Sequence, residues 1–327
     1  KYETALPAKL WQLHQEQPRG PYYARMFCFC SFTDGFPGFF HDFEQCAPKW
    51  CDICYYEPPG AGSRRMERIP DTLEEWAEDA WQCLLPAFQQ MAKGGVAEGC
   101  PFAFDGHSLG AFVATLVAAR ARAEFSLEPC CVFFSSSAAP TRRFLCEAWW
   151  SYLRDKPTEP LPLHVLQGIG YSSKVEVGDR VYEAVMGTVR TAFRFVVSID
   201  HIFHIFSCPM FVFVDRYGYS DRYDTRTAAD YSAWEHWTTD TCEVTTVDAK
   251  SQQGSIRYHP QMTDKLWRVF GELAGCVNGN TNAHRARISR SPNRPRSIPR
   301  APSKHFPTEA GFRAGMPHFT PFSGHLE

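Results

Sequence analysis

The chain has 327 residues, of which 44% are hydrophobic and 21% charged, and its formal net charge is −2 at pH 7. This is ample for a globular core and suits one α/β domain with additions, or two small domains. The near-neutral charge gives no reason to expect a nucleic-acid partner, and no apolar run reaches the roughly 18 residues of a transmembrane segment. The thirteen cysteines, without a visible secretory signal, indicate reduced thiols in an intracellular compartment, cytoplasmic or organellar.

The two ends of the chain differ from its centre in composition. The chain begins at Lys1, and we expect an upstream targeting segment to be missing. Residues 1–24 are polar and weakly patterned, which is typical of an N-terminal arm. From residue 277 onward Arg, Ser, Pro and Asn dominate, as in RISRSPNRPRSIPR at 287–300. Such a composition buries too little apolar surface to fold, so 277–327 is predicted to be a disordered, solvated tail rather than a binding segment for acidic partners.

Two strands and a long helix are predicted in the first hundred residues. Apolar runs favour strands at 25–30 and 52–57, and the second run ends in a Pro-Pro-Gly turn. Apolar residues at helical spacing predict a helix over 71–92, with Asp71 or Thr72 as its N-terminal cap.

A pair of cysteines in the second of these strands has the spacing of a redox motif or half of a zinc site. Cys51 and Cys54 are separated by two residues, but in a strand residues three apart point to opposite faces. No second cysteine pair with metal-site spacing accompanies them. We therefore expect neither a metal site nor another cofactor.

One stretch, Cys100–Arg120, has the pattern of a strand, a turn and a helix. The run Pro101–Phe104 favours a short buried strand, and Ala111–Arg120 carries the small and branched apolar residues of a packed helix. Between them Gly106-His-Ser-Leu-Gly110 forms a G-x-S-x-G motif. The bare motif often marks only a glycine-flanked turn, but this context is the one that a nucleophile elbow requires.

The elbow predicts a definite geometry. Ser108 should have a strained backbone at the top of the sheet, and a side chain at Gly106 or Gly110 would collide with neighbouring backbone. The hydroxyl then lies near the N-terminus of the following helix, where the dipole and N–H groups favour a developing anion. We therefore predict Ser108 as the nucleophile of a serine hydrolase and the N–H of Leu109 as an oxyanion donor.

The second half of the chain continues the alternation of strands and helices. Apolar runs predict buried strands at 130–134 and 208–215, a last strand is predicted at 242–248, and a helix follows at about 260–274. This rhythm indicates the α/β class with a doubly wound, mostly parallel sheet. Residues 141–205 break the rhythm, and either a helical lid over the site or a plain helical layer on the sheet fits them.

Four segments resemble the type II thioesterases, the stand-alone editing enzymes of polyketide and nonribosomal peptide synthases within the α/β-hydrolase superfamily. Residues 26–30 and the loop after them resemble that family's first strand and its FP-hydrophobe-AGG loop. Residues 56–64 are similar to its PGRG-x-R segment, with Glu67 beyond. Residues 101–110 closely resemble PFALFGHSMG, and 134–140 resemble SG-xx-AP.

The resemblance implies an α/β-hydrolase domain over residues 25–276, with a helical lid at about 141–205. It also implies an enzyme that hydrolyses acyl thioesters, with the acyl group on the phosphopantetheine arm of an acyl carrier protein or on coenzyme A. Fatty-acid, polyketide and nonribosomal peptide metabolism are the settings in which such substrates arise. We expect the enzyme to act as a monomer.

The resemblance also assigns the partners of the nucleophile, which follow it in the order Ser, Asp, His in this fold. Ser108, Asp221 and His259 satisfy the order, and His259 precedes a final helix at the family's distance. Asp221 matches the family's GD-x-D loop, while Asp215 and Asp224 near the same strand stay open as alternatives.

The second oxyanion N–H is expected from the loop after the first strand, at Ser31 or Phe32, with Phe32 as our candidate. In that loop Thr33-Asp-Gly35 replaces the family's paired glycines, and the flanking glycines of its GGHF segment are missing around His259. The remaining histidines that lie near predicted elements are interpreted as packed or helical residues: His107, His201, His204 and His236.

Two other functions remain open at this point. A lipase or esterase that cleaves oxygen esters would use the same triad. A non-catalytic protein of this fold, binding acyl groups or partners, is the second alternative, since two loops depart from the family's pattern.

Overall fold

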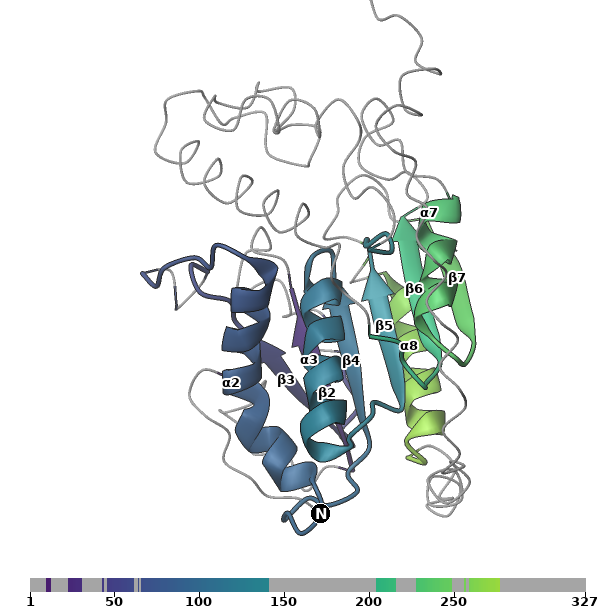
Figure 1. Cartoon of the computed structure of the whole chain (residues 1–327). Helices are drawn as coiled ribbons and strands as arrows, with labels where there is room; N and C mark the ends of the chain where they lie inside the picture. The colour runs from purple at the N-terminus through teal and green to yellow at the C-terminus, as the bar shows by residue number, and fades with distance from the viewer. Residues whose placement is uncertain are drawn as a thin grey trace, which may run out of the picture. The chain divides into compact units, whose positions relative to one another are not determined.

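The computed structural model describes the residues that form a central sheet and the helices beside it (Figure 1). These are residues 10–12, 23–30, 43, 46–61, 64, 66–140, 204–215, 228–248, 256 and 259–276. The tail expected at 277–327 and nearly all of the lid expected at 141–205 lie outside the described residues, as does most of the predicted arm.

In the part of the chain that the structure describes, seven strands form one sheet in the order β1-β3-β2-β4-β5-β6-β7. Strands β2 to β7 are parallel, and the edge strand β1 runs antiparallel to β3. The strands are β1 (Leu10–Gln12), β2 (Ala24–Phe29), β3 (Cys51–Tyr56), β4 (Phe102–His107), β5 (Cys131–Ser135), β6 (Met210–Asp215) and β7 (Cys242–Val247). The predicted doubly wound, mostly parallel sheet is confirmed.

Three of the described helices lie where the sequence pattern predicts them: α2 (Leu73–Met91), α3 (Gly110–Phe125) and α8 (Pro260–Leu273). The short helix α7 (Ala228–Ser232) and the 3-10 helix η4 (Ala233–Trp237) lie between β6 and β7. The cap of α2 is Thr72, whose hydroxyl accepts a hydrogen bond from the N–H of Glu75 at 3.1 Å. Among the helices that the structure describes, none has both the length and the apolar character needed to cross a membrane.

The region predicted as an N-terminal arm, residues 1–24, contributes a short edge strand to the sheet. Leu10 pairs with Tyr56 and Gln12 with Cys54, so β1 extends the sheet at the β3 edge. A strand of three residues is held by backbone pairing to its neighbour more than by its own side chains. Its sequence therefore carries no alternating pattern long enough to reveal it.

Apolar side chains cover both faces of the sheet, and this places helices on each face. Phe27, Phe104 and Phe134 belong to the core that α2, α3 and η4 complete. Met26 and Phe133 belong to the opposite core, which α8 completes. Successive residues of a strand point to opposite faces, so parallel strands that are buried on both sides read as continuous apolar runs.

The order of the strands creates a switch point between β2 and β4. From β2 the chain moves outward to β3, and it then returns across β2 to build β4, β5, β6 and β7 on the other side. Phe43, in the connection after β2, lies in the α8-side core, while α3, which follows β4, lies on the opposite face. In open parallel sheets ligands bind beyond the carboxyl ends of the strands at such a point.

Candidate active site

The predicted nucleophile lies at this switch point, directly after β4. Ser108 has φ 53, in the left-handed region that residues with a side chain rarely adopt. Its N–H donates to the carbonyl of Ser135 at 2.9 Å, and its own carbonyl accepts from the N–H of Ala111 at 3.2 Å. The sharp turn between strand and helix, with the strained backbone predicted for a nucleophile elbow, is therefore present.

The two glycines of the motif are required by close backbone contacts. A Cβ built on Gly106 would lie 2.6 Å from the Cα of Ala111, and one on Gly110 would lie 2.3 Å from the carbonyl oxygen of Phe29. Both contacts are with backbone, which cannot move aside as a flexible side chain does. The predicted collisions are confirmed, and Gly110 also brings the start of α3 against the end of β2.

One of the two predicted oxyanion donors belongs to the described residues. Leu109 is the N-terminal cap residue of α3, is buried and has φ −62. The first N–H groups of a helix have no partner within the helix and carry its partial positive charge. The Leu109 N–H thus lies at the N-terminus of α3 beside Ser108, and its role as an oxyanion donor stays a prediction. Phe32 and its alternative Ser31 lie outside the described residues.

The side chain of His107, directly before Ser108, links β4 to the neighbouring strand β5. Its ring is fully buried, and Nδ1 lies 2.8 Å from the hydroxyl of Ser135 on the neighbouring strand. The same residue, Ser135, accepts the Ser108 N–H through its carbonyl. The ring thus ties β4 to β5 beside the nucleophile, as the interpretation of His107 as a packing residue requires.

The predicted base lies at the start of α8. Figure 1 shows α8 running back beside the sheet from the edge at which β7 ends, so its N-terminus is at the carboxyl edge. His259 is the cap residue of this helix, partly buried, and its Nδ1 accepts from the N–H of Gln261 at 3.3 Å. Among the described residues no hydrogen bond joins His259 to Ser108, so the base assignment stays a prediction.

The predicted acid lies beyond β6. Asp215 is the last residue of that strand, and its backbone pairs with Val247 of β7. The side chain of Asp215 and the whole of Asp221 and Asp224 lie outside the described residues. All three candidates follow the carboxyl end of β6, and the choice of Asp221 also stays a prediction.

The cysteine pair of β3 has the arrangement expected from strand geometry. Cys51 packs in the core beneath α8, and Cys54 packs in the core beneath α2 and α3. The two thiols therefore point to opposite faces, as predicted. Burial, together with the nearby Asp52, raises the pKa of both thiols well above the ordinary value for cysteine.

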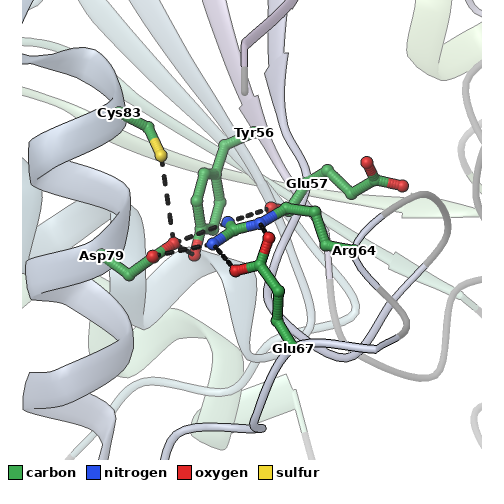
Figure 2. Close-up of polar contacts among 6 residues, drawn as sticks. All are labelled: Tyr56, Glu57, Arg64, Glu67, Asp79 and Cys83. Carbon is green, nitrogen blue, oxygen red and sulfur yellow. Dashed lines mark hydrogen bonds and ion pairs between the residues drawn. The ribbon is translucent and has the colours of Figure 1, made fainter. Parts of the chain in front are cut away.

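A second polar cluster lies at the end of β3, and the sequence resemblance indicated only some of its charged residues. Figure 2 shows the guanidinium of Arg64 between the carboxylates of Glu67 and Asp79, with the hydroxyl of Tyr56 beside them. Arg64 and Glu67 belong to the segment that resembles PGRG-x-R, but Asp79 was missed. A signal existed, because Asp79 interrupts the apolar stripe of α2 between Trp76 and Cys83.

Comparison with known families identifies the chain. Residues 24–253, most of the chain, match the family model of the thioesterase domain. The chain belongs to the thioesterase domain family. The matched range covers β2 to β7 and ends before His259 and α8, so the predicted base lies beyond it.

Solved thioesterases share this fold at low sequence identity. RedJ, a thioesterase from the prodiginine pathway of Streptomyces coelicolor, is 20% identical with a TM-score of 0.57 and covers 79% of this chain and 92% of its own. YbtT, the type II thioesterase of the yersiniabactin pathway, is 18% identical with a TM-score of 0.58 and covers 82% and 97%. BorB, a type II thioesterase from the borrelidin cluster, is 17% identical with a TM-score of 0.57, covering 83% and 98%. At these identities the likeness establishes the α/β-hydrolase fold.

One curated protein is related over a shorter stretch. Linear gramicidin dehydrogenase LgrE of Brevibacillus parabrevis is 28% identical over 109 residues, which is 33% of this chain and 38% of that protein. The chain therefore matches little more than a third of the length of this relative.

Proposed function

We propose that this member of the thioesterase family is a serine hydrolase of the type II kind, which cleaves acyl thioesters through Ser108. The observation that carries the proposal is the left-handed backbone of Ser108, φ 53, between β4 and α3 at the switch point of the sheet. This turn presents a hydroxyl at the N-terminus of α3, where an oxyanion is stabilised. Membership of the family favours a thioester as the acyl donor.

The proposed reaction has two halves. His259 accepts the proton of the Ser108 hydroxyl as its oxygen attacks the thioester carbonyl, and the carbonyl oxygen becomes an oxyanion. The N–H of Leu109 and an N–H near Phe32 stabilise that oxyanion, each donor contributing on the order of 3 kcal/mol. The C–S bond then breaks, and His259 returns the proton to the departing thiolate. Water, deprotonated by His259, attacks the acyl-serine, and the carboxylic acid and the free hydroxyl are restored.

Asp221 completes the proposal as the residue that orients and stabilises the imidazolium. In the structure Nδ1 of His259 faces the N–H of Gln261 at 3.3 Å, a long hydrogen bond. Catalytic hydrogen bonds are often poorly aligned without substrate, so a rotation of this ring toward the acid is expected on binding.

The proposed substrate is an acyl group on the phosphopantetheine arm of a carrier protein, with an acyl-coenzyme A as the small-molecule equivalent. The support comes from the relatives: YbtT is a type II thioesterase from an NRPS/PKS biosynthetic pathway, and LgrE is a linear gramicidin dehydrogenase. We expect the enzyme to act on this partner as a monomer within the cell.

Mass spectrometry of intact proteins tests the nucleophile and the reaction class together. The chain is mixed with a panel of acylated carrier proteins, beside a Ser108→Ala control that keeps the turn. We expect acyl loss from a carrier with the wild type and a decrease of at least about 1,000-fold in the variant.

The alternatives give different results in the same assay. Faster cleavage of nitrophenyl esters than of thioesters of equal chain length would assign a lipase or esterase instead. A wild type that neither deacylates carriers nor reacts with a fluorophosphonate at Ser108 would leave a non-catalytic acyl-binding or partner-binding protein.

A further inference from the structure

The cluster around Arg64 uses the full bonding capacity of a buried guanidinium. Nε and Nη2 donate to the two oxygens of Glu67 at 3.0 and 2.6 Å. Nη1 and Nη2 donate to the two oxygens of Asp79 at 2.7 and 2.8 Å, and Nη1 also donates to the carbonyl of Glu57 at 2.8 Å. These bonds use all five N–H donors of a side chain that is only 5% exposed. Paired bidentate bonds fix both the position and the plane of the group.

The cluster joins the end of β3 to α2. Tyr56, the last residue of β3, donates its hydroxyl to Asp79 of α2 at 2.7 Å. Burial, with the adjacent carboxylate, raises the pKa of Tyr56 well above its ordinary value, so this hydroxyl remains a donor. Although burial alone would lower it, the bonds to Asp79 and Glu67 raise the pKa of Arg64, so the guanidinium remains charged.

The same cluster closes the loop that follows β3. The N–H of Gly60, at φ 85, donates to the carbonyl of Arg64 at 3.0 Å, and the N–H of Arg64 donates to the carbonyl of Ala61 at 2.8 Å. The Glu57 carbonyl binds the guanidinium from the other end of the loop. The described residues of this loop are therefore joined by hydrogen bonds to one another and to the residue that follows β3.

A continuous line of contacts leads from this cluster to the nucleophile elbow. Tyr56 lies level with Phe29 of β2, and Phe29 lies level with Gly106 of β4. The rings of Phe29 and Tyr56 are in contact, with centroids 6.2 Å apart. The carbonyl oxygen of Phe29 lies so close to Gly110 that a Cβ at Gly110 would be only 2.3 Å from it. These contacts form a path by which a displacement of the end of β3 would reach the end of β2 and the start of α3.

We propose that Arg64 is a positioning residue of the hydrolytic reaction, which fixes the carboxyl ends of β3 and β2 and so the geometry around Ser108. This inference rests on the proposed function. Arg64 acts through Tyr56 and Phe29 and does not touch the substrate. The end of β2 is also where the loop with the second predicted oxyanion donor begins, so the effect falls on the chemical step.

The test separates positioning from folding by counting active sites. A fluorophosphonate titrates reactive Ser108, and kcat for thioester hydrolysis is then expressed per titrated site. Arg64→Lys keeps the charge but loses the planar five-donor fork. We expect kcat per site to fall about 10- to 100-fold with KM changed less than twofold, because small misplacements of reacting groups have effects of this size. The rate constant of phosphonate labelling should fall in parallel.

A second variant avoids an unpaired buried charge. Arg64→Met combined with Asp79→Leu replaces the ion pair by apolar groups of similar size, a change that buried pairs often tolerate in folding. It should fold and show the same loss of kcat per site. The matched control is Arg68→Gln: Arg68 also bonds two carboxylates, Asp71 and Glu75, but is 68% exposed, and it should leave kcat per site unchanged.

The outcomes distinguish the two proposals. If both Arg64 variants keep kcat per titrated site within twofold of the wild type while their stability falls, the positioning role is overturned and the cluster is structural. If the wild type labels at Ser108 but hydrolyses no thioester, the proposed function fails, and the labelling rates still decide the role of Arg64. In that case, equal rates of phosphonate labelling in the wild type and the Arg64 variants would overturn the positioning role of Arg64.

Discussion

Two serines with left-handed backbones lie at the ends of adjacent strands. Ser108 follows β4 with φ 53, and Ser136 follows β5 with φ 52, where the N–H of Ser136 donates to the carbonyl of Phe213. The segment containing Ser136 resembles SG-xx-AP, in which glycine occupies this place. A side chain in this conformation costs about 1–2 kcal/mol, which the surrounding contacts must offset. The backbone strain at Ser108 accompanies its proposed role as the nucleophile, whereas the backbone strain at Ser136 is at a residue to which no catalytic role is assigned.

Replacing Ser136 by glycine should stabilise the protein. Glycine adopts a positive φ without a Cβ clash but gains entropy on unfolding, so the net rise in the free energy of unfolding is about 0.5–1 kcal/mol. Urea denaturation of Ser136→Gly measures it. Ser136→Ala is the control, because alanine keeps the Cβ and should not stabilise. Ser126 has φ 57 after α3, so Ser126→Gly makes the same substitution away from the site. If neither glycine variant raises the free energy of unfolding, the strain argument is refuted.

At the scale of elements, α2 carries both the partly buried Asp79 and one side of the core, so the start of this helix contributes to stability. The hydroxyl of Thr72 satisfies the N–H of Glu75, and the carboxylate of Glu75 accepts from the N–H of Asp71 at 3.0 Å. These bonds satisfy N–H groups at the helix N-terminus that have no partner within the helix.

Thr72→Ala should lower the free energy of unfolding by about 1 kcal/mol, because the N–H of Glu75 loses its acceptor. In a chain of this size the corresponding decrease in Tm is about 2–4 °C, measurable by calorimetry. Gln89→Ala, at an exposed position of the same helix, is the control and should change Tm by less than 1 °C, as surface substitutions typically do. Equal shifts in both variants would argue against the cap.

The elements show what a sequence pattern can and cannot predict. Strands β2, β4 and β5 are buried along their whole length, so each contains an apolar run that is visible without a structure. The strand β4 continues through His107, past the apolar run, because pairing with Ser135 extends it. Strand β1 depends on backbone pairing with β3, and that partner is about forty residues away, so no local pattern reveals it.

The same distinction applies to the candidate site of the whole molecule. Ser108, Leu109 and the two glycines are contiguous, so one motif predicts their geometry. The predicted base and acid follow β7 and β6, and their proposed approach to Ser108 depends on tertiary structure that spacing does not encode. The bond between Arg64 and Asp79 joins a loop to a helix for the same reason, and only the break in an apolar stripe hinted at it.

The stability of the whole fold should depend on pH through a buried histidine. His204 is 8% exposed, and its ring meets the ring of Phe206 edge-on at 4.8 Å. Burial, with the nearby positive charge of Arg122, lowers the pKa of His204 from 6.5 to about 4. Between these values the unfolded chain binds a proton that the folded chain excludes, so stability decreases as the pH falls from 6.5 to 4.

The lost stability amounts to about 3 kcal/mol across this window, since one pKa unit corresponds to about 1.4 kcal/mol. His204→Gln removes the titrating group and should flatten the curve of unfolding free energy against pH by that amount, as measured by urea denaturation at several pH values. Glu128, whose pKa is raised by burial, contributes with the opposite sign and is present in both proteins, so their difference isolates His204. A His204→Gln curve that parallels the wild type would mean that this ring titrates alike in the folded and unfolded chains.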